Sequence, residues 1–490
     1  MNRIMGPVEL AALVRLDGGA PDALSVQVYR SLRDAIGAGR LAPGSTLVSS
    51  REAALALGVS RNTVTTAYDL LRAEGMVETR PGAAPRVPHL APAPPPEPAP
   101  AGEVMAGLSE RGAVLARDVR ARLYARREGA LAPGNPDPAL FPADAWARAL
   151  RRAARLLPGA ATGYADYAGL ARLRGMIAAR LGQDRGLAVA PDQVLIIPGT
   201  QAGLALVAQA LGDPGDVALV EDPGYPGARA AFEGAGLEVR SLPVDASGAD
   251  LAQAGDAARA RLIYVTPGNQ YPLGGRMPMA RRVALIAHAA STGSLIVEDD
   301  YDAEFLWRGR GLPALAALGS GAEVIHVGTF AKSLMPALRV GWLAVPAGLA
   351  APLRTAHRNL GLAVPVHVQA ALADFMDDGH YRAHLRRITR TYAARERLLA
   401  EALAPLVAAD LLVLHRPDGG LKMAVEFTAP VDEAAVLADL ARAGFAVAGL
   451  SGLCQSPVRA GLVVGFADAD ERRVTRFAAA LASALGHAAR

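Results

Sequence analysis

Residues 323–345 read EVIHVGTFAKSLMPALRVGWLAV, and this stretch decides the fold predicted for the chain. A short apolar run typical of a β-strand precedes Lys332, and a second such run follows Arg339. Lys332 is one of only two lysines among 51 lysines and arginines, the other being Lys422. Arginine is permanently charged, whereas a buried lysine can lose its proton and attack a carbonyl carbon. The sequence therefore indicates a reactive amine at Lys332, with a chance surface lysine as the alternative.

Four other apolar runs end in polar residues in the same way. They occupy residues 193–200, 216–222, 261–270 and 294–302. Uniformly apolar runs of this kind are typical of parallel strands covered by helices on both faces, and polar residues at their carboxyl ends favour a ligand crevice there. After His380 a basic helix leads into a predicted small α+β subdomain. We therefore expect an α/β fold.

Two polar clusters at strand ends are candidate ligand-binding segments. Thr200 and Gln201 open a helix directly after a strand, so the backbone N–H groups and the helix dipole there favour a phosphate. The sequence EDDYD at residues 298–302 ends another strand. A cation site is the alternative reading of that acidic cluster, but it would leave Lys332 and Arg339 unexplained.

Composition and spacing argue against several classes of protein. The 490 residues carry a net charge of +4, so any contact with nucleic acid must come from a local surface. Cys454 is the single cysteine, which excludes an internal disulfide and fits a reducing compartment. No signal peptide or long apolar run is found, so a cytoplasmic protein is expected. His380 and His384 lie outside any HExxH motif, which predicts an exposed helix face and no metal site.

Residues 24–87 are predicted to form a small helical domain. After a first helix, Ser49 and Ser60 can each begin a further helix, with a tight glycine-containing turn between the two. The helix that starts at Arg61 carries short polar side chains and arginine, which can reach base edges and phosphates. Residues 76–87 are predicted to form a hairpin wing. The pattern favours a winged helix-turn-helix domain.

Residues 88–127 are predicted to be a linker. Their first part reads PHLAPAPPPEPAPAG, in which proline removes backbone donors and favours an extended, semi-rigid polyproline chain. A ligand for a proline-binding module is the alternative. The remaining residues, 128–490, are then assigned to one large domain.

The segment GTFAKSL at residues 328–334, together with Arg339, resembles the Schiff-base segment of fold-type I pyridoxal-phosphate enzymes. The resemblance is strongest to the version found in MocR-type regulators. It implies that Lys332 is the catalytic lysine, which forms a Schiff base with pyridoxal 5′-phosphate. It also implies that Thr329 and Arg339 hold the cofactor phosphate, for which the helix start at residues 200–201 is a further predicted contact.

Further segments resemble the same family. The EDDYD motif implies that Asp299 keeps the pyridine nitrogen protonated and that Tyr301 contacts O3′ of the cofactor. The EDPGY motif implies that Tyr225 stacks on the ring, a tyrosine in a Pro/Gly turn being the alternative. Tyr271 stands where aminotransferases have an asparagine, which argues against fast transamination. Arg459 precedes the predicted terminal strand, where aminotransferases bind the substrate carboxylate; an arginine in a surface loop is the alternative.

Residues 41–82 are similar to the winged helix of GntR regulators over their whole length. The similarity implies that the first turns of the two helices in this segment contact operator DNA. The predicted DNA-binding residues are Arg51, Ser60, Arg61, Asn62 and Thr63.

Together these resemblances imply both a fold and a function. The fold is an N-terminal winged helix-turn-helix, a Pro-rich linker, and a fold-type I aminotransferase-like domain with a small C-terminal α+β subdomain. The function is a pyridoxal-phosphate-dependent transcriptional regulator that senses an amino compound, or the cofactor itself, through Lys332. A working aminotransferase is the alternative. A homodimer is expected, because fold-type I sites lie at a dimer interface in this family and winged helices usually read repeated half-sites.

Overall fold

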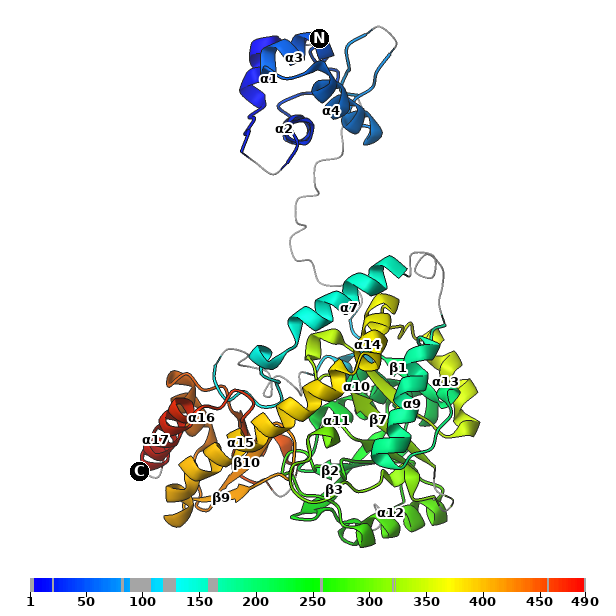
Figure 1. Ribbon diagram of the computed structural model, residues 1–490, viewed down its shortest axis with the longest axis vertical. Helices are drawn as coiled ribbons and strands as arrows, with labels where there is room; N and C mark the ends of the chain where they lie inside the picture. Colours follow the sequence, from blue (N-terminus) through cyan, green and yellow to red (C-terminus); the bar gives the residue numbers. More distant parts are fainter. Residues whose placement is uncertain are drawn as a thin grey trace. The chain divides into compact units, whose positions relative to one another are not determined.

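The computed structural model describes residues 4–19, 22–80, 83–88, 107–117, 129–156, 166–255, 259–319, 321, 323–455 and 458–488. The chain divides into two compact units, Met1–Gly107 and Leu108–Arg490 (Figure 1). Each unit has its own hydrophobic core, formed by different buried side chains.

The first unit is a small helical domain with a core made mainly of leucine, valine and alanine side chains. The helix at its N-terminus was not predicted, yet it buries Leu10, and Met5 just before it donates a backbone hydrogen bond to Thr46. The other three helices agree with the prediction. The helices are α1 (Pro7–Leu13), α2 (Leu24–Gly37), α3 (Ser50–Leu57) and α4 (Arg61–Ala73).

Two serines fix where the second pair of helices begins. The Ser49 hydroxyl accepts a hydrogen bond from the backbone of Glu52 at 3.3 Å, and Ser60 accepts one from Thr63 at 3.1 Å. Each bond satisfies an N–H group that has no partner within its own helix. The predicted wing is present as an antiparallel pairing of Glu78 with Arg86, and its tip, residues 81–82, lies outside the described residues.

The second unit is built on an eight-stranded sheet in the order β1-β8-β7-β6-β5-β2-β3-β4. All five predicted parallel strands are present and share one direction, whereas β8, the second apolar run of residues 323–345, lies antiparallel between β1 and β7. The strands β3 and β4 were not predicted. The strands are β1 (Val194–Ile197), β2 (Val217–Asp222), β3 (Glu238–Asp245), β4 (Gly248–Ala249), β5 (Leu262–Val265), β6 (Leu295–Asp299), β7 (Val324–Thr329) and β8 (Gly341–Ala344).

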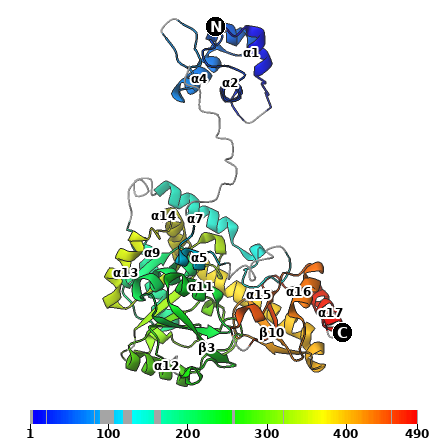
Figure 2. The same cartoon turned by 180° about the vertical axis from the view of Figure 1, so that it is seen from behind.

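Helices cover both faces of this sheet, which is why its strands are apolar throughout (Figures 1 and 2). In β5, Leu262 and Tyr264 pack on the face covered by α10 and α11, while Ile263 and Val265 pack with α12. The helices around this sheet are α9 (Ala171–Arg185), α10 (Thr200–Leu211), α11 (Pro226–Ala235), α12 (Met279–Thr292), α13 (Ala347–Asn359) and α14 (Val366–Asp377), and α7 (Ala143–Leu156) packs against α14.

The predicted small subdomain is a four-stranded antiparallel sheet in the order β11-β12-β10-β9, packed against helices. The long helix α15 runs from the large sheet to this subdomain (Figure 1). The elements are α15 (His380–Ala408), β9 (Leu412–His415), β10 (Lys422–Phe427), α16 (Glu433–Arg442), β11 (Ala448–Gly449), β12 (Gly461–Gly465) and α17 (Glu471–Ala488).

A short helix, α5 (Glu110–Leu115), lies within the range predicted to be linker. It packs against α11, where the Arg111 guanidinium donates to the Gly234 carbonyl oxygen at 3.5 Å (Figure 2). Most of the other linker residues, 89–106 and 118–127, lie outside the described residues. Within the described part of the chain, no helix combines the length and the apolar character needed to cross a membrane.

Candidate functional site

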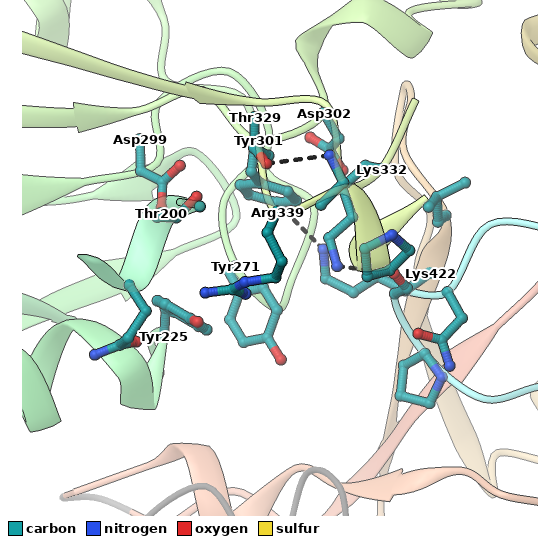
Figure 3. A pocket seen from close by; sticks show the side chains of 18 of the residues that line it. Thr200, Tyr225, Tyr271, Asp299, Tyr301, Asp302, Thr329, Lys332, Arg339 and Lys422 are labelled. Atoms are coloured by element: carbon teal, nitrogen blue, oxygen red, sulfur yellow. Dashed lines mark hydrogen bonds between the residues drawn. The ribbon is translucent and has the colours of Figure 1, made fainter. Parts of the chain in front are cut away.

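A cavity opens where the parallel strands of the large sheet end and the small subdomain begins (Figure 3). Loops that follow β1, β6 and β7 supply much of its wall, and the start of β10 supplies another part. The structure brings all the residues predicted to bind the cofactor into this one cavity. They are Thr200, Gln201, Tyr225, Asp299, Tyr301, Thr329, Lys332 and Arg339.

One part of the cavity is built around the first turn of α10. Gly199 precedes this helix with a φ of 94°, which glycine adopts without strain. A Cβ at this position would lie 3.3 Å from the guanidinium carbon of Arg339, so the missing side chain lets the arginine approach the helix start. The N–H groups of a helix N-terminus and a guanidinium both attract anions. This arrangement suits a phosphate group.

Asp299 ends β6 and is buried against the cavity. Its Oδ2 accepts a hydrogen bond from the Tyr264 hydroxyl at 2.8 Å, whereas its Oδ1 has no partner among the described residues. Burial, which disfavours the charged form, raises the pKa of Asp299 to about 7. A buried oxygen of this kind is a site for a hydrogen-bond donor. A protonated ring nitrogen fits it.

Lys332 follows β7, and its Nζ donates a hydrogen bond to the Gly134 carbonyl oxygen at 2.7 Å. The next residue, Ser333, is buried, and its carbonyl oxygen accepts a hydrogen bond from His384 Nε2 at 2.8 Å. His384 is therefore buried, and its predicted exposure is wrong, because α15 packs against the loop that carries Lys332. These contacts hold the lysine loop in place on the cavity wall.

Three tyrosines form one wall of the cavity (Figure 3). Tyr225 and Tyr271 meet edge to face with ring centres 5.6 Å apart, and Tyr271 and Tyr301 meet in the same way at 6.1 Å. The Tyr301 hydroxyl donates to the Asn269 carbonyl oxygen at 2.8 Å. Tyr271 thus lines the cavity between the other two tyrosines.

In the first unit, the start of α4 presents a polar surface. Arg61 and Asn62 are exposed and Thr63 is half-buried, whereas Val64 and Tyr68 on the opposite side are buried. The Arg61 side chain donates to the Ser50 hydroxyl at 3.3 Å, which links α4 to α3. The remaining members of the predicted DNA-binding set, Arg51 and Ser60, are also exposed.

Comparison with known proteins agrees with this division of the chain. Residues 24–87 match the family described as bacterial regulatory proteins, gntR family, and residues 131–447 match aminotransferase class I and II. A protein of Rhizobium meliloti, described as a probable rhizopine catabolism regulatory protein, MocR, is 38% identical over 96% of this chain and 95% of its own length. The chain belongs to the MocR-type regulators. A second MocR-type relative is PdxR of Corynebacterium glutamicum, described as an HTH-type pyridoxine biosynthesis transcriptional regulator, which is 32% identical over 94% of this chain and 95% of its own length.

The large domain of this MocR-type chain has the fold of pyridoxal-phosphate aminotransferases. The structure of LysN, an α-aminoadipate aminotransferase from Thermus thermophilus complexed with a phosphopyridoxyl-leucine, superimposes with a TM-score of 0.70 and 26% identity. The match covers 77% of this chain and 98% of LysN. The donor set of the cavity fits the same cofactor, because an anion site at α10 and a buried carboxylate oxygen are both present.

Lys422 also lines the cavity, although no role was predicted for it. Its Nζ donates a hydrogen bond to the Tyr301 hydroxyl at 2.6 Å, and the side chain is only 5% exposed. Desolvation lowers the pKa of Lys422 to about 8. The sequence could have indicated a role for Lys422, because the chain has only two lysines and this scarcity was the reason for singling out Lys332.

Arg459, predicted to bind a substrate carboxylate, is not among the residues that line this cavity. It forms a two-pronged ion pair with Glu426 on β10, with nitrogen–oxygen distances of 2.8 and 2.5 Å. This pairing lowers the pKa of Glu426. The Arg459 guanidinium is therefore already paired with a carboxylate on a neighbouring strand of the small subdomain.

The acidic cluster at residues 298–302 is divided between structural and cavity roles. Glu298 accepts hydrogen bonds from two backbone N–H groups, at Leu315 and Ala316. Asp300 pairs with Arg185, while Asp299 and Asp302 line the cavity. Among the described residues, no group of histidines, cysteines and acids is arranged to hold a metal ion.

Proposed function

We propose that this chain is a pyridoxal-phosphate-dependent, DNA-binding regulator that senses a primary amine at Lys332. The observation that carries the proposal is the convergence on one cavity of Lys332, the Arg339 anion site and Asp299, whose Oδ1 has no hydrogen-bond partner in the described part of the chain. DNA binding through the start of α4 is supported by the match to the gntR family and by the exposure of Arg61 and Asn62. A bacterial regulator of this kind would act in the cytoplasm.

Each part of the cofactor has a counterpart in the cavity. The first turn of α10, with Arg339 and Thr329, would hold the phosphate; Asp299 would hold the ring nitrogen, Tyr225 the ring face and Tyr301 the ring oxygen. When bound, pyridoxal phosphate supplies an aldehyde that condenses reversibly with primary amines and a ring that withdraws electrons.

The residues of the chain then have defined tasks. Ionised Asp299 keeps a proton on the ring nitrogen, and Lys332 supplies the amine that an effector amine would displace. The Gly134 carbonyl oxygen, 2.7 Å from Lys332 Nζ, gives the displaced lysine a hydrogen-bond partner. An effector can shift DNA binding only by as much as its affinity differs between two conformations of the chain.

Reduction with borohydride tests this assignment directly. The protein incubated with pyridoxal phosphate and then reduced should carry a pyridoxyl group on Lys332, identified by peptide mass spectrometry. Lys332→Ala should carry none, although Lys422 is still present in the same cavity. A modification found on Lys422 in the parent, or on neither lysine, would contradict the proposal.

Two related functions are distinguished by how the protein responds to amines. An aminotransferase would show multiple turnovers with release of pyridoxamine phosphate, whereas the proposed sensor would show a spectral change with little turnover. Tyr271, which fills the place of the aminotransferase asparagine, favours the sensor. A regulator that senses only the cofactor would change its operator affinity on cofactor binding without any amine.

We further expect a homodimer. Winged-helix domains usually read repeated half-sites, so two copies of the first unit would be required for one operator. Sedimentation velocity of the cofactor-bound protein at micromolar concentration should give the mass of two chains. A monomer under these conditions would contradict the expectation.

A further inference from the structure

Lys422 reaches the cavity from the small subdomain, because β10 begins at the cavity wall (Figure 3). Gly420, two residues before it, has a φ of 90°. A Cβ on Gly420 would lie 2.5 Å from Asp302 Oδ2 and 2.6 Å from Asn269 Nδ2, so only glycine lets the strand approach the large subdomain this closely. This close approach therefore brings the start of β10, which carries Lys422, to the cavity wall.

The surroundings of this ammonium satisfy it only in part. Its Nζ lies 4.6 Å from the ring centre of Tyr271 and 4.4 Å from that of Tyr301, whose hydroxyl accepts its hydrogen bond. An ammonium has three donors, and among the described residues this hydrogen bond is the one that Nζ makes. A buried ammonium is unfavourable unless it is paired, so the remaining donors favour an anionic partner.

Asp302 supplies part of the compensating charge. Its Oδ2 already accepts a hydrogen bond from Asn269 at 2.7 Å, and burial raises its pKa to about 6 while Lys422 acts in the opposite direction. Conversely, attraction to Asp302 opposes the desolvation that lowers the pKa of Lys422. Asp302 therefore keeps Lys422 cationic enough to bind an anion without using up its donors.

Three other positively charged side chains could bind the anionic group of an effector, but each already has another role or partner. Lys332 is the proposed site of covalent attachment, and Arg339 adjoins Gly199 at the helix start that suits the phosphate. Arg459 is paired with Glu426 and does not line the cavity. We infer that Lys422 binds the anionic group of the effector, which is therefore a primary amine that also bears a carboxylate or a sulfonate. The inference rests on the proposed amine-sensing function and names its ligand class.

The choice of lysine has a consequence for selectivity. Arginine offers a planar fork that matches a carboxylate, whereas an ammonium is a point charge without a preferred planar partner. Lys422 should accept a tetrahedral sulfonate as readily as a planar carboxylate. An amine without an acidic group offers no anion to the remaining donors of Lys422, so it should bind more weakly than its acidic counterpart.

The test compares amino acids with their neutral amides on the intact, cofactor-loaded protein. Glycine, β-alanine and 4-aminobutanoate, their carboxamides, and taurine are titrated while the visible absorption of the bound cofactor is followed. A charge-assisted hydrogen bond predicts that the best acid binds about tenfold to a hundredfold more tightly than its amide. Lys422→Met should reduce this preference to about one by weakening the acid alone, and Lys422→Arg should retain it.

The outcomes separate this inference from the proposed function. A parent protein that binds acid and amide equally would overturn the inference, and this measurement does not depend on any variant folding. If Lys422→Met still preferred the acid over its amide, the inference would also be overturned. If Arg459→Gln lost this preference, Arg459 and not Lys422 would be the residue that binds the anionic group. If no amine changes the absorption although borohydride fixes the cofactor to Lys332, amine sensing itself is wrong and the inference falls with it.

Discussion

Asp299→Asn is expected to weaken the binding of pyridoxal phosphate by about a hundredfold or more, since breaking a buried ion pair costs roughly 3–5 kcal/mol. Asp299 lines the cavity and its Oδ1 has no partner among the described residues, and an amide there cannot balance the charge of a protonated ring. Equilibrium dialysis of parent and variant measures the loss. Asp300→Asn is a poor control because it would break a buried ion pair with Arg185. Glu238→Gln on β3 breaks only an exposed ion pair with Arg240, so it is the matched variant and should bind normally.

The same substitution should stabilise the cofactor-free protein at alkaline pH. Burial raises the pKa of Asp299 to about 7 in the folded chain, above its unfolded value of 3.8. A raised carboxyl pKa stabilises the fold fully only below the unfolded pKa, and this stabilisation is lost as the pH rises through the folded pKa. Asparagine does not ionise, so the variant avoids a cost on the order of a few kcal/mol at pH 8.

Thermal unfolding of the cofactor-free proteins at pH 8 and pH 5 measures this effect. The variant should melt at a higher temperature than the parent at pH 8, and the difference should shrink toward pH 5. Equal melting temperatures at both pH values, together with unchanged cofactor affinity, would show that Asp299 is not the charge partner of the ring.

The cavity residues that were predicted all belong to segments next to the ends of strands. This shared position explains why they could be predicted from the sequence alone. Asp299 ends β6, Lys332 follows the end of β7, and Arg339 lies just before β8, whose first residue pairs with the last residue of β7. Each stands within a short motif whose local spacing carries the chemistry. The order of the strands places these ends together, because parallel strands in one sheet align their carboxyl ends. The local motifs and the order of the strands therefore independently indicate the same edge of the sheet as the place of the cavity.

The residues that were missed or displaced depend on contacts between distant segments. Lys422 enters the cavity only because Gly420 permits β10 to approach Asp302, a contact between subdomains that no local pattern encodes. Arg459 pairs with Glu426 because the antiparallel pairing of β10 and β12 places Glu426 opposite Gly461, close to Arg459 in the chain. Strand register of this kind is fixed by tertiary packing rather than by local sequence.

Arg61→Ala is expected to lower operator affinity by about tenfold to a hundredfold, because one base or phosphate contact contributes roughly 1–3 kcal/mol. Arg61 is the first residue of α4, is exposed, and stands beside Asn62, so its guanidinium is free to approach a DNA groove from the helix start. Its hydrogen bond to Ser50, at 3.3 Å, is long and easily exchanged for a phosphate contact. Fluorescence anisotropy with the upstream region of the chain's own gene measures the change.

Arg72→Ala is the matched control, because Arg72 is also an exposed arginine of α4 but lies in its last turn, about 16 Å along the helix axis from Arg61. Removing Arg72 lowers the local charge equally and breaks only an exposed ion pair with Asp69, so any weakening of DNA binding should be small. Both variants should retain a full pyridoxyl adduct on Lys332, because Arg61 and the cavity belong to different compact units. If Arg61→Ala bound the operator as tightly as the parent, or Arg72→Ala lost as much affinity, the start of α4 would not be the surface that reads DNA.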